Sequence, residues 1–120
     1  MKNNTAQKFG YAFKGIKTAI KEEMHLRFHL IAALIVLMSS AYFNISATEW
    51  ICILIIIGLV IFAELVNSAL ENLVDLAQPD QHPLAGKVKD MAAGAVLFIS
   101  LVAVAIGSII FWPHICSLIA

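Results

Sequence analysis

Three long apolar segments dominate the sequence, and they limit the folds that the chain can adopt. The clearest is the uncharged stretch 50–63; in the whole chain 61% of residues are hydrophobic, against roughly half in a soluble domain. An apolar helix of about 20 residues is long enough to cross a bilayer. The sequence therefore predicts an all-α membrane protein with one domain, residues 1–120. Its transmembrane helices are expected over about 28–43, 50–76 and 84–112, with Pro113 ending the last.

The basic residues occur in only two groups. Six of the eight precede the first apolar segment, and Lys87 and Lys89 lie between the second and the third. Short loops rich in Lys and Arg stay in the cytoplasm. We therefore expect a cytoplasmic N-terminus and an external C-terminus. The formal net charge is zero, so the bulk charge gives no reason to expect a nucleic-acid partner.

An amphipathic helix is expected before the first span, over about 9–27. Its apolar residues recur every three or four positions from Phe9 to Ile20, and its lysines share another face. A basic amphipathic helix in this position is typical of the membrane interface. If the helix is unbroken, Glu22 falls on the polar side and Glu23 beside the apolar stripe. Glu23 would then point toward membrane or protein and need a partner.

The end of the second apolar segment carries acidic and amide residues on one helical face. Glu64, Asn67, Glu71 and Asp75 follow at spacings of three and four residues. Ionisable residues at membrane depth are costly and usually functional. Glu64 and Glu71 would be separated by ~10 Å along the axis, which suits two adjacent tasks, one with a proton and one with a cation. Taken alone, Asp75 is expected to be solvated and Glu71 suits an interfacial surface residue equally well. The whole stripe would also suit a proton-coupled transporter.

The loop before the third span contains His82, and the helix after it contains Lys89 and Asp90. Lys can bind phosphate as a point charge. Without further context, however, an interfacial Lys, an Asp in the first turns of a helix and a capping His explain the same residues. Gly-rich phosphate loops, soluble-kinase signatures and zinc-type clusters do not occur in the sequence. A nucleotide enzyme of this kind would depend on carboxylates, Mg²⁺ and a few basic residues.

Two segments together resemble the small membrane-embedded bacterial diacylglycerol kinase family. They are "AELVNSALENLVDL" and "HPLAGKVKDMAAGAVL", and "YAFKGIKTAIKEEMHLRFH" also resembles the interfacial helix of that family. The resemblance extends from Phe9 to about Trp112. It implies a homotrimer with three spans per subunit in the bacterial cytoplasmic membrane. It also implies a lipid kinase that transfers the γ-phosphoryl group of MgATP to a lipid hydroxyl.

The resemblance also implies roles for individual residues. Glu64 would be the general base, with Asn67 beside it at the reaction centre. Glu23 and Glu71 would hold Mg²⁺. The nucleotide-binding positions would be Tyr11, Glu23, Glu71, His82, Lys89 and Asp90.

The lipid substrate is predicted from departures within this resemblance. "RFHLIAA" and "PDQHPLA" resemble the undecaprenol kinase branch, whereas diacylglycerol kinases have Gln-Glu in place of Phe28 and His29. The N-terminal Arg of the Gram-negative enzymes also has no counterpart before Phe9. A polyprenol needs fewer polar partners than a glycerol ester, which favours undecaprenol over diacylglycerol. His29 suits a structural role, donating to a neighbouring helix, equally well.

A hypothesis of another class is a small oligomeric proton-coupled transporter or membrane helper subunit. Such a protein would use Glu64 as a proton site. It would have no need of Glu23, Lys89 and Asp90 for ATP.

Overall fold

The computed structural model describes residues 4–120, so residues 1–3 of the expected single domain lie outside the described part. This part is all-helical, as predicted, and contains four helices. They are α1 (Thr5–Glu22), α2 (Met24–Tyr42), α3 (Ala47–Ala77) and α4 (Pro83–Ile119). The last three are long and apolar enough to cross a membrane. Three spans and a preceding helix therefore agree with the sequence pattern.

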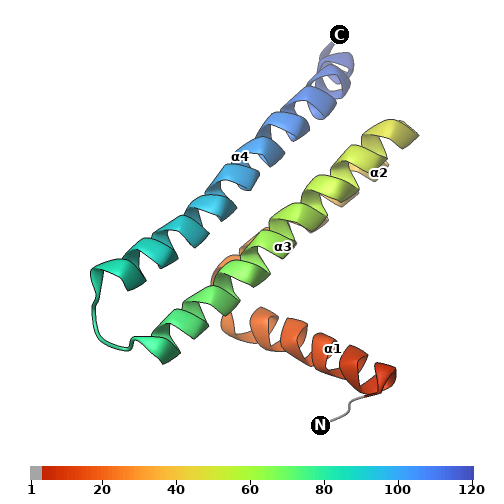
Figure 1. Cartoon of the computed structure of the whole chain (residues 1–120). Helices are drawn as coiled ribbons and strands as arrows, with labels where there is room; N and C mark the ends of the chain where they lie inside the picture. Colours follow the sequence, from red (N-terminus) through yellow and green to blue (C-terminus); the bar gives the residue numbers. More distant parts are fainter. Residues whose placement is uncertain (1–3) are drawn as a thin grey trace.

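α3 is the central element of the bundle. It packs against α4 along much of its length and against α2 on another side. Figure 1 shows α1 inclined to these helices, at the same end of the bundle as the loop between α3 and α4. The turn between α2 and α3 lies at the other end, with the C-terminus. The two groups of basic residues described by the structure are thus at one end of the bundle.

Local sequence signals explain where the helices begin. Asn4 and Ser46 each accept a hydrogen bond from the backbone three residues later, and Gln7 and Glu49 bond back to complete capping boxes. α4 begins at Pro83, whose missing N–H costs nothing in a first turn. α3 ends before Pro79, because a residue that precedes proline is driven out of the helical region.

The end of the bundle distant from α1 has an apolar core. Ile45, Ile53 and Ile110 are buried there, and the Phe43 and Phe111 rings lie 6.1 Å apart. His114 of α4 lies 3.4 Å from Glu49 of α3. These contacts join α3, α4 and the turn between α2 and α3, so they fix this end of the bundle.

Two sequence-based expectations about helix ends are wrong. Pro113 does not end α4, which continues to Ile119. A proline inside a helix removes one backbone donor, and transmembrane helices tolerate this when neighbours satisfy the freed carbonyl. The expected unbroken helix over 9–27 is also interrupted, because Glu23 is extended (φ −105°, ψ 109°) between α1 and α2.

Candidate functional site

Glu64 is a buried carboxylate in the apolar helix α3. Only 4% of the residue is exposed. Its Oε2 atom lies 3.7 Å from Nε2 of His29 on α2. This separation is slightly too long for a hydrogen bond, but it makes the His29 imidazole the polar neighbour of the Glu64 carboxylate. A buried carboxylate needs such a partner because desolvation of an isolated charge is costly.

Asn67 and Glu71 continue the same face of α3 toward the loop. Asn67 Nδ2 donates to Glu71 Oε1 at 3.2 Å, which fixes the orientation of the amide. Asn67 Oδ1 is buried and has no hydrogen-bond partner among residues 4–120. An orphaned acceptor beside a carboxylate is a suitable environment for a hard cation or for water bound to it. The acidic face predicted from the helical spacing thus contains a paired amide and carboxylate.

The corner between α1 and α2 presents Glu23. Glu23 is half-buried, whereas Glu22 is exposed, so Glu23 is the less solvated of the two although the helix is broken. Its role at the site stays a prediction. α1 also packs against α3, so the helix that ends at this corner contacts the helix that carries the acidic face.

Arg27 fixes the corner, a role that the sequence analysis missed. Its Nη1 donates to the carbonyl oxygens of Ile20 (3.0 Å) and Lys21 (2.7 Å). The last carbonyls of a helix need donors from outside the helix. Arg27 lies four residues after Glu23 in the sequence, but this spacing has a meaning only once the helix break at Glu23 is known. The sequence analysis did not predict that break.

We expect Arg27→Ala to weaken MgATP binding through displacement of Glu23. It should raise the KM for MgATP several-fold and lower the free energy of unfolding by about 1 kcal/mol, the typical value of a hydrogen bond. Steady-state kinetics and thermal unfolding measure these effects. Arg27→Lys is the control, because it keeps the charge and loses the guanidinium fork. An unchanged KM for MgATP in Arg27→Ala would contradict the positioning role.

The loop between α3 and α4 forms a cavity of about 570 Å³. Asp75, His82 and Lys89 line it, and Lys89 Nζ forms an ion pair with Asp75 Oδ1. His82 caps α4, because its Nδ1 accepts a hydrogen bond from the Leu84 backbone N–H. The capping interpretation of His82 is therefore confirmed. Asp75 is exposed, as expected, but it is paired.

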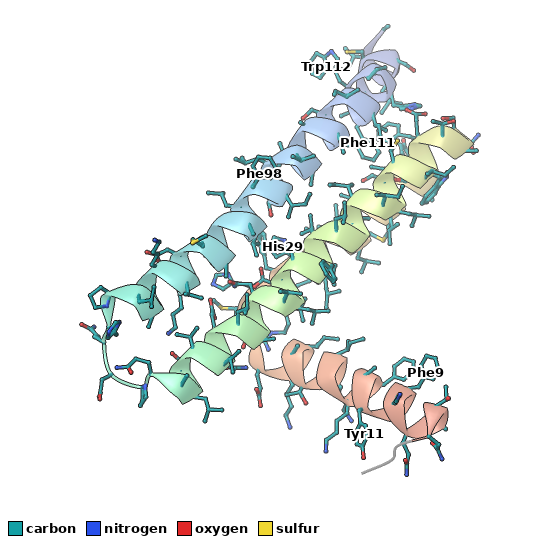
Figure 2. All side chains as sticks on the ribbon, viewed as in Figure 1. Phe9, Tyr11, His29, Phe98, Phe111 and Trp112 are labelled. Atoms are coloured by element: carbon teal, nitrogen blue, oxygen red, sulfur yellow. The ribbon has the colours of Figure 1, made fainter. Side chains whose placement is uncertain are left out.

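The remaining predicted site residues lie on the surface. Asp90 is exposed beside Lys89. Tyr11 is 57% exposed on α1, and Figure 2 shows it on the side of α1 away from the bundle. Twelve residues separate it from Glu23, or ~18 Å along a helix. A single chain thus brings Glu64, Asn67 and Glu71 together on α3 but does not bring Tyr11 to the loop cavity.

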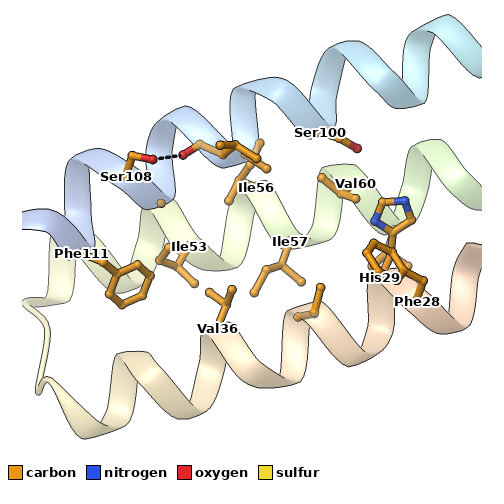
Figure 3. A pocket seen from close by; sticks show the side chains of 16 residues that line it. Phe28, His29, Val36, Ile53, Ile56, Ile57, Val60, Ser100, Ser108 and Phe111 are labelled. Carbon is orange, nitrogen blue, oxygen red and sulfur yellow. Dashed lines mark hydrogen bonds between the residues drawn. The ribbon is translucent and has the colours of Figure 1, made fainter. Parts of the chain in front are cut away.

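An apolar groove runs along α3 between α2 and α4, and its volume is about 560 Å³ (Figure 3). Its lining includes Val36, Ile57, Val60 and Phe111. Among the described residues that line it, His29 is the only ionisable one, and it lies toward the Glu64 end. The groove therefore connects the apolar part of the bundle with the buried carboxylate.

Groups of three or more His, Cys, Asp or Glu suited to a metal ion are absent from residues 4–120. The donors available for a cation are thus one or two carboxylates with an amide oxygen. This set fits Mg²⁺, which usually keeps water ligands and binds through few protein carboxylates together with phosphate oxygens. Glu71, with the free Oδ1 of Asn67 beside it, would supply the α3 part of such a site.

Comparisons with known proteins agree with this arrangement. A family model for prokaryotic diacylglycerol kinase matches residues 10–111. The chain is 37% identical to an undecaprenol kinase of Bacillus subtilis (strain 168), covering 94% of this chain and 92% of that protein. It is 32% identical to a diacylglycerol kinase of Escherichia coli (strain K12), covering 88% and 86%. It is 34% identical to a diacylglycerol kinase of Helicobacter pylori (strain J99), covering 88% and 75%.

These matches confirm the resemblance seen in the sequence, and they support an ATP-using lipid kinase over the transporter hypothesis. The match covers the acidic face of α3, the corner at Glu23 and the loop before α4. The chain therefore belongs to the prokaryotic diacylglycerol kinase family, whose members are membrane lipid kinases.

Proposed function

We propose that this protein transfers the γ-phosphoryl group of MgATP to the hydroxyl group of undecaprenol, with diacylglycerol as the alternative acceptor. One observation carries the proposal: the buried Glu64 carboxylate lies next to His29, where an apolar groove ends. A membrane alcohol has a long apolar chain and one reactive oxygen. A groove that leads to a carboxylate suits both parts of such a molecule.

Glu64 is the proposed general base. As the alcohol oxygen forms its bond to the γ-phosphorus, the hydroxyl proton passes to a Glu64 carboxylate oxygen. The bond between the γ-phosphorus and the bridging oxygen breaks, and ADP leaves with that oxygen. Asn67, one turn further along α3, would orient groups at the reaction centre through its amide. Phosphoryl transfer depends mainly on positioning and charge neutralisation, which a few well-held side chains can provide.

Glu71 and Glu23 are the proposed Mg²⁺-holding residues. When bound, Mg²⁺ would neutralise charge on the phosphate oxygens of ATP. Glu71 is held by Asn67, and Glu23 is held at a corner that Arg27 braces. The Glu71 carboxylate is thus oriented by a hydrogen bond, whereas for Glu23 it is the backbone of the preceding helix end that Arg27 holds.

The loop cavity, which His82 and Lys89 line, is the proposed location of part of the nucleotide site. Glu23, Glu71 and Asp90 are proposed to bind other parts of the nucleotide. Lys89 is paired with Asp75 in the structure. Phosphate would have to compete with this carboxylate for the ammonium group. Asp75 would then retain Lys89 near the cavity when no nucleotide is bound.

Tyr11 would join the nucleotide site from a neighbouring subunit. It is separated from the other nucleotide residues within one chain, and large apolar residues remain exposed on all of the spanning helices. Both observations suit a homotrimer with sites shared between subunits. The proposed location is the bacterial cytoplasmic membrane, with a cytoplasmic N-terminus and an external C-terminus. The grouping of α1 and the loop before α4 at one end of the bundle supports this orientation.

The substrate proposal predicts a preference for undecaprenol over diacylglycerol. With both lipids in the same mixed micelles, we expect a higher kcat/KM for undecaprenol, because the groove is apolar with one ionisable residue. Product ratios at several lipid ratios measure this preference. A preference for diacylglycerol would reverse the substrate assignment and leave the kinase intact. Absence of phosphorylated product from both lipids, in folded protein with MgATP, would contradict the proposed function.

A further inference from the structure

Among residues 4–120, His29 is the one basic side chain in contact with the Glu64 carboxylate. It is on α2 and Glu64 is on α3, so the contact joins two helices. The His29 side chain is 18% exposed and that of Glu64 is 5% exposed. Low exposure strengthens electrostatic interactions, since little water screens them. The orientation of the Glu64 carboxylate therefore depends on His29 more than on solvent.

The His29 ring is itself held in place. Its centroid lies 5.6 Å from that of Phe28, with the rings nearly perpendicular at 77°. Figure 3 shows the imidazole extending from α2 toward α3, at the end of the groove. The ring is thus placed between the apolar groove and the buried carboxylate.

We infer that His29 is a positioning residue for Glu64, an inference that rests on the proposed role of Glu64 as the base. Its Nε2–H group donates to one carboxylate oxygen, so that the other oxygen remains free to accept the hydroxyl proton. The 3.7 Å separation would shorten when the alcohol and nucleotide are bound, as catalytic hydrogen bonds often do. His29 keeps its own proton throughout, and the hydroxyl proton ends on Glu64.

Four variants of the full-length protein and one control variant test this inference in mixed micelles with undecaprenol and MgATP. His29→Leu removes the donor at similar volume, and His29→Gln retains an N–H donor. Glu64→Gln and the His29→Leu/Glu64→Gln double variant complete a cycle. His25→Leu is the matched control, because His25 is an exposed residue of the same helix. The measured quantities are kcat, the KM values for both substrates and the midpoint of thermal unfolding.

We expect His29→Leu to lower kcat about ten-fold or more, the scale of one hydrogen bond to a charged group. The KM for MgATP should stay within two-fold, and His29→Gln should restore kcat to within about three-fold of the wild type. In the Glu64→Gln background, His29→Leu should cause little further loss, because residues that act through one another are non-additive. His25→Leu should match the wild type.

Three results would overturn the inference. One is a wild-type kcat in His29→Leu while Glu64→Gln is inactive. That result would leave Glu64 as the general base but remove the positioning role of His29. Another is a loss by the same factor in both backgrounds, which shows that His29 does not act through Glu64. The third is a folded His29→Gln variant whose kcat is as low as that of His29→Leu. Full activity of Glu64→Gln would instead refute the proposed base, so the two failures are distinguishable.

Discussion

Replacing Glu64 by Gln is expected to lower kcat by roughly 10²–10⁴-fold, the usual contribution of a general base. Gln has nearly the same shape and keeps an acceptor oxygen, but it cannot take the hydroxyl proton. The affinity for MgATP should change little, since the proposed Mg²⁺ ligand on α3 is Glu71, about two turns away. Single-turnover measurements with undecaprenol and MgATP would isolate the chemical step.

The fold should tolerate this substitution. Glu64 is 4% exposed, and Gln has nearly the same volume and keeps an acceptor oxygen, so the amide variant is expected to pack like the acid. Thermal unfolding should therefore distinguish a chemical defect from a structural one. Glu49→Gln is a control on the same helix, because Glu49 lies at the opposite end beside His114. Near wild-type turnover in Glu64→Gln would show that another group accepts the proton.

The helices could be predicted from the sequence because apolar length and local end signals are encoded within each segment. The uncharged stretch 50–63 indicates a span by itself, and Ser46 with Glu49 supplies the cap. The acidic face of α3 could also be predicted, since the spacing of Glu64 and Glu71 depends only on helical geometry. Both features are local in sequence.

The features that were missed or wrong depend on contacts or on backbone choices that spacing does not reveal. The break at Glu23 interrupts an otherwise good amphipathic pattern, and the carbonyls that it frees accept from Arg27. Continuation of α4 through Pro113 depends on how its neighbours satisfy the freed carbonyl. The contact between His29 and Glu64 joins different helices, so no periodicity predicts it. Whether His29 has a structural role or a role at the site therefore depends on the packing of α2 on α3, which the sequence alone does not show.

Glu23→Gln and Glu71→Gln are each expected to raise the Mg²⁺ and MgATP concentrations needed for half-maximal activity, by about ten-fold or more. The reason is that each substitution removes one of two proposed carboxylate ligands of a cation that prefers hard oxygen donors. Helix α1, which ends beside Glu23, packs against α3, which carries Glu71. Arg27 braces the corner at Glu23. Magnesium titrations at fixed ATP, followed by ATP titrations at saturating Mg²⁺, would separate the two affinities.

The double variant distinguishes one shared ion from two independent sites. If both carboxylates hold the same ion, the second substitution should add much less than the first, with a coupling energy of roughly 0.5–3 kcal/mol. Glu22→Gln is the matched control, because Glu22 is exposed and adjacent to Glu23. It should retain the wild-type Mg²⁺ dependence. Strict additivity of Glu23→Gln and Glu71→Gln, or a larger defect in Glu22→Gln than in Glu23→Gln, would refute the shared-ion assignment, because neither result is compatible with one cation held between the corner and the acidic face of α3.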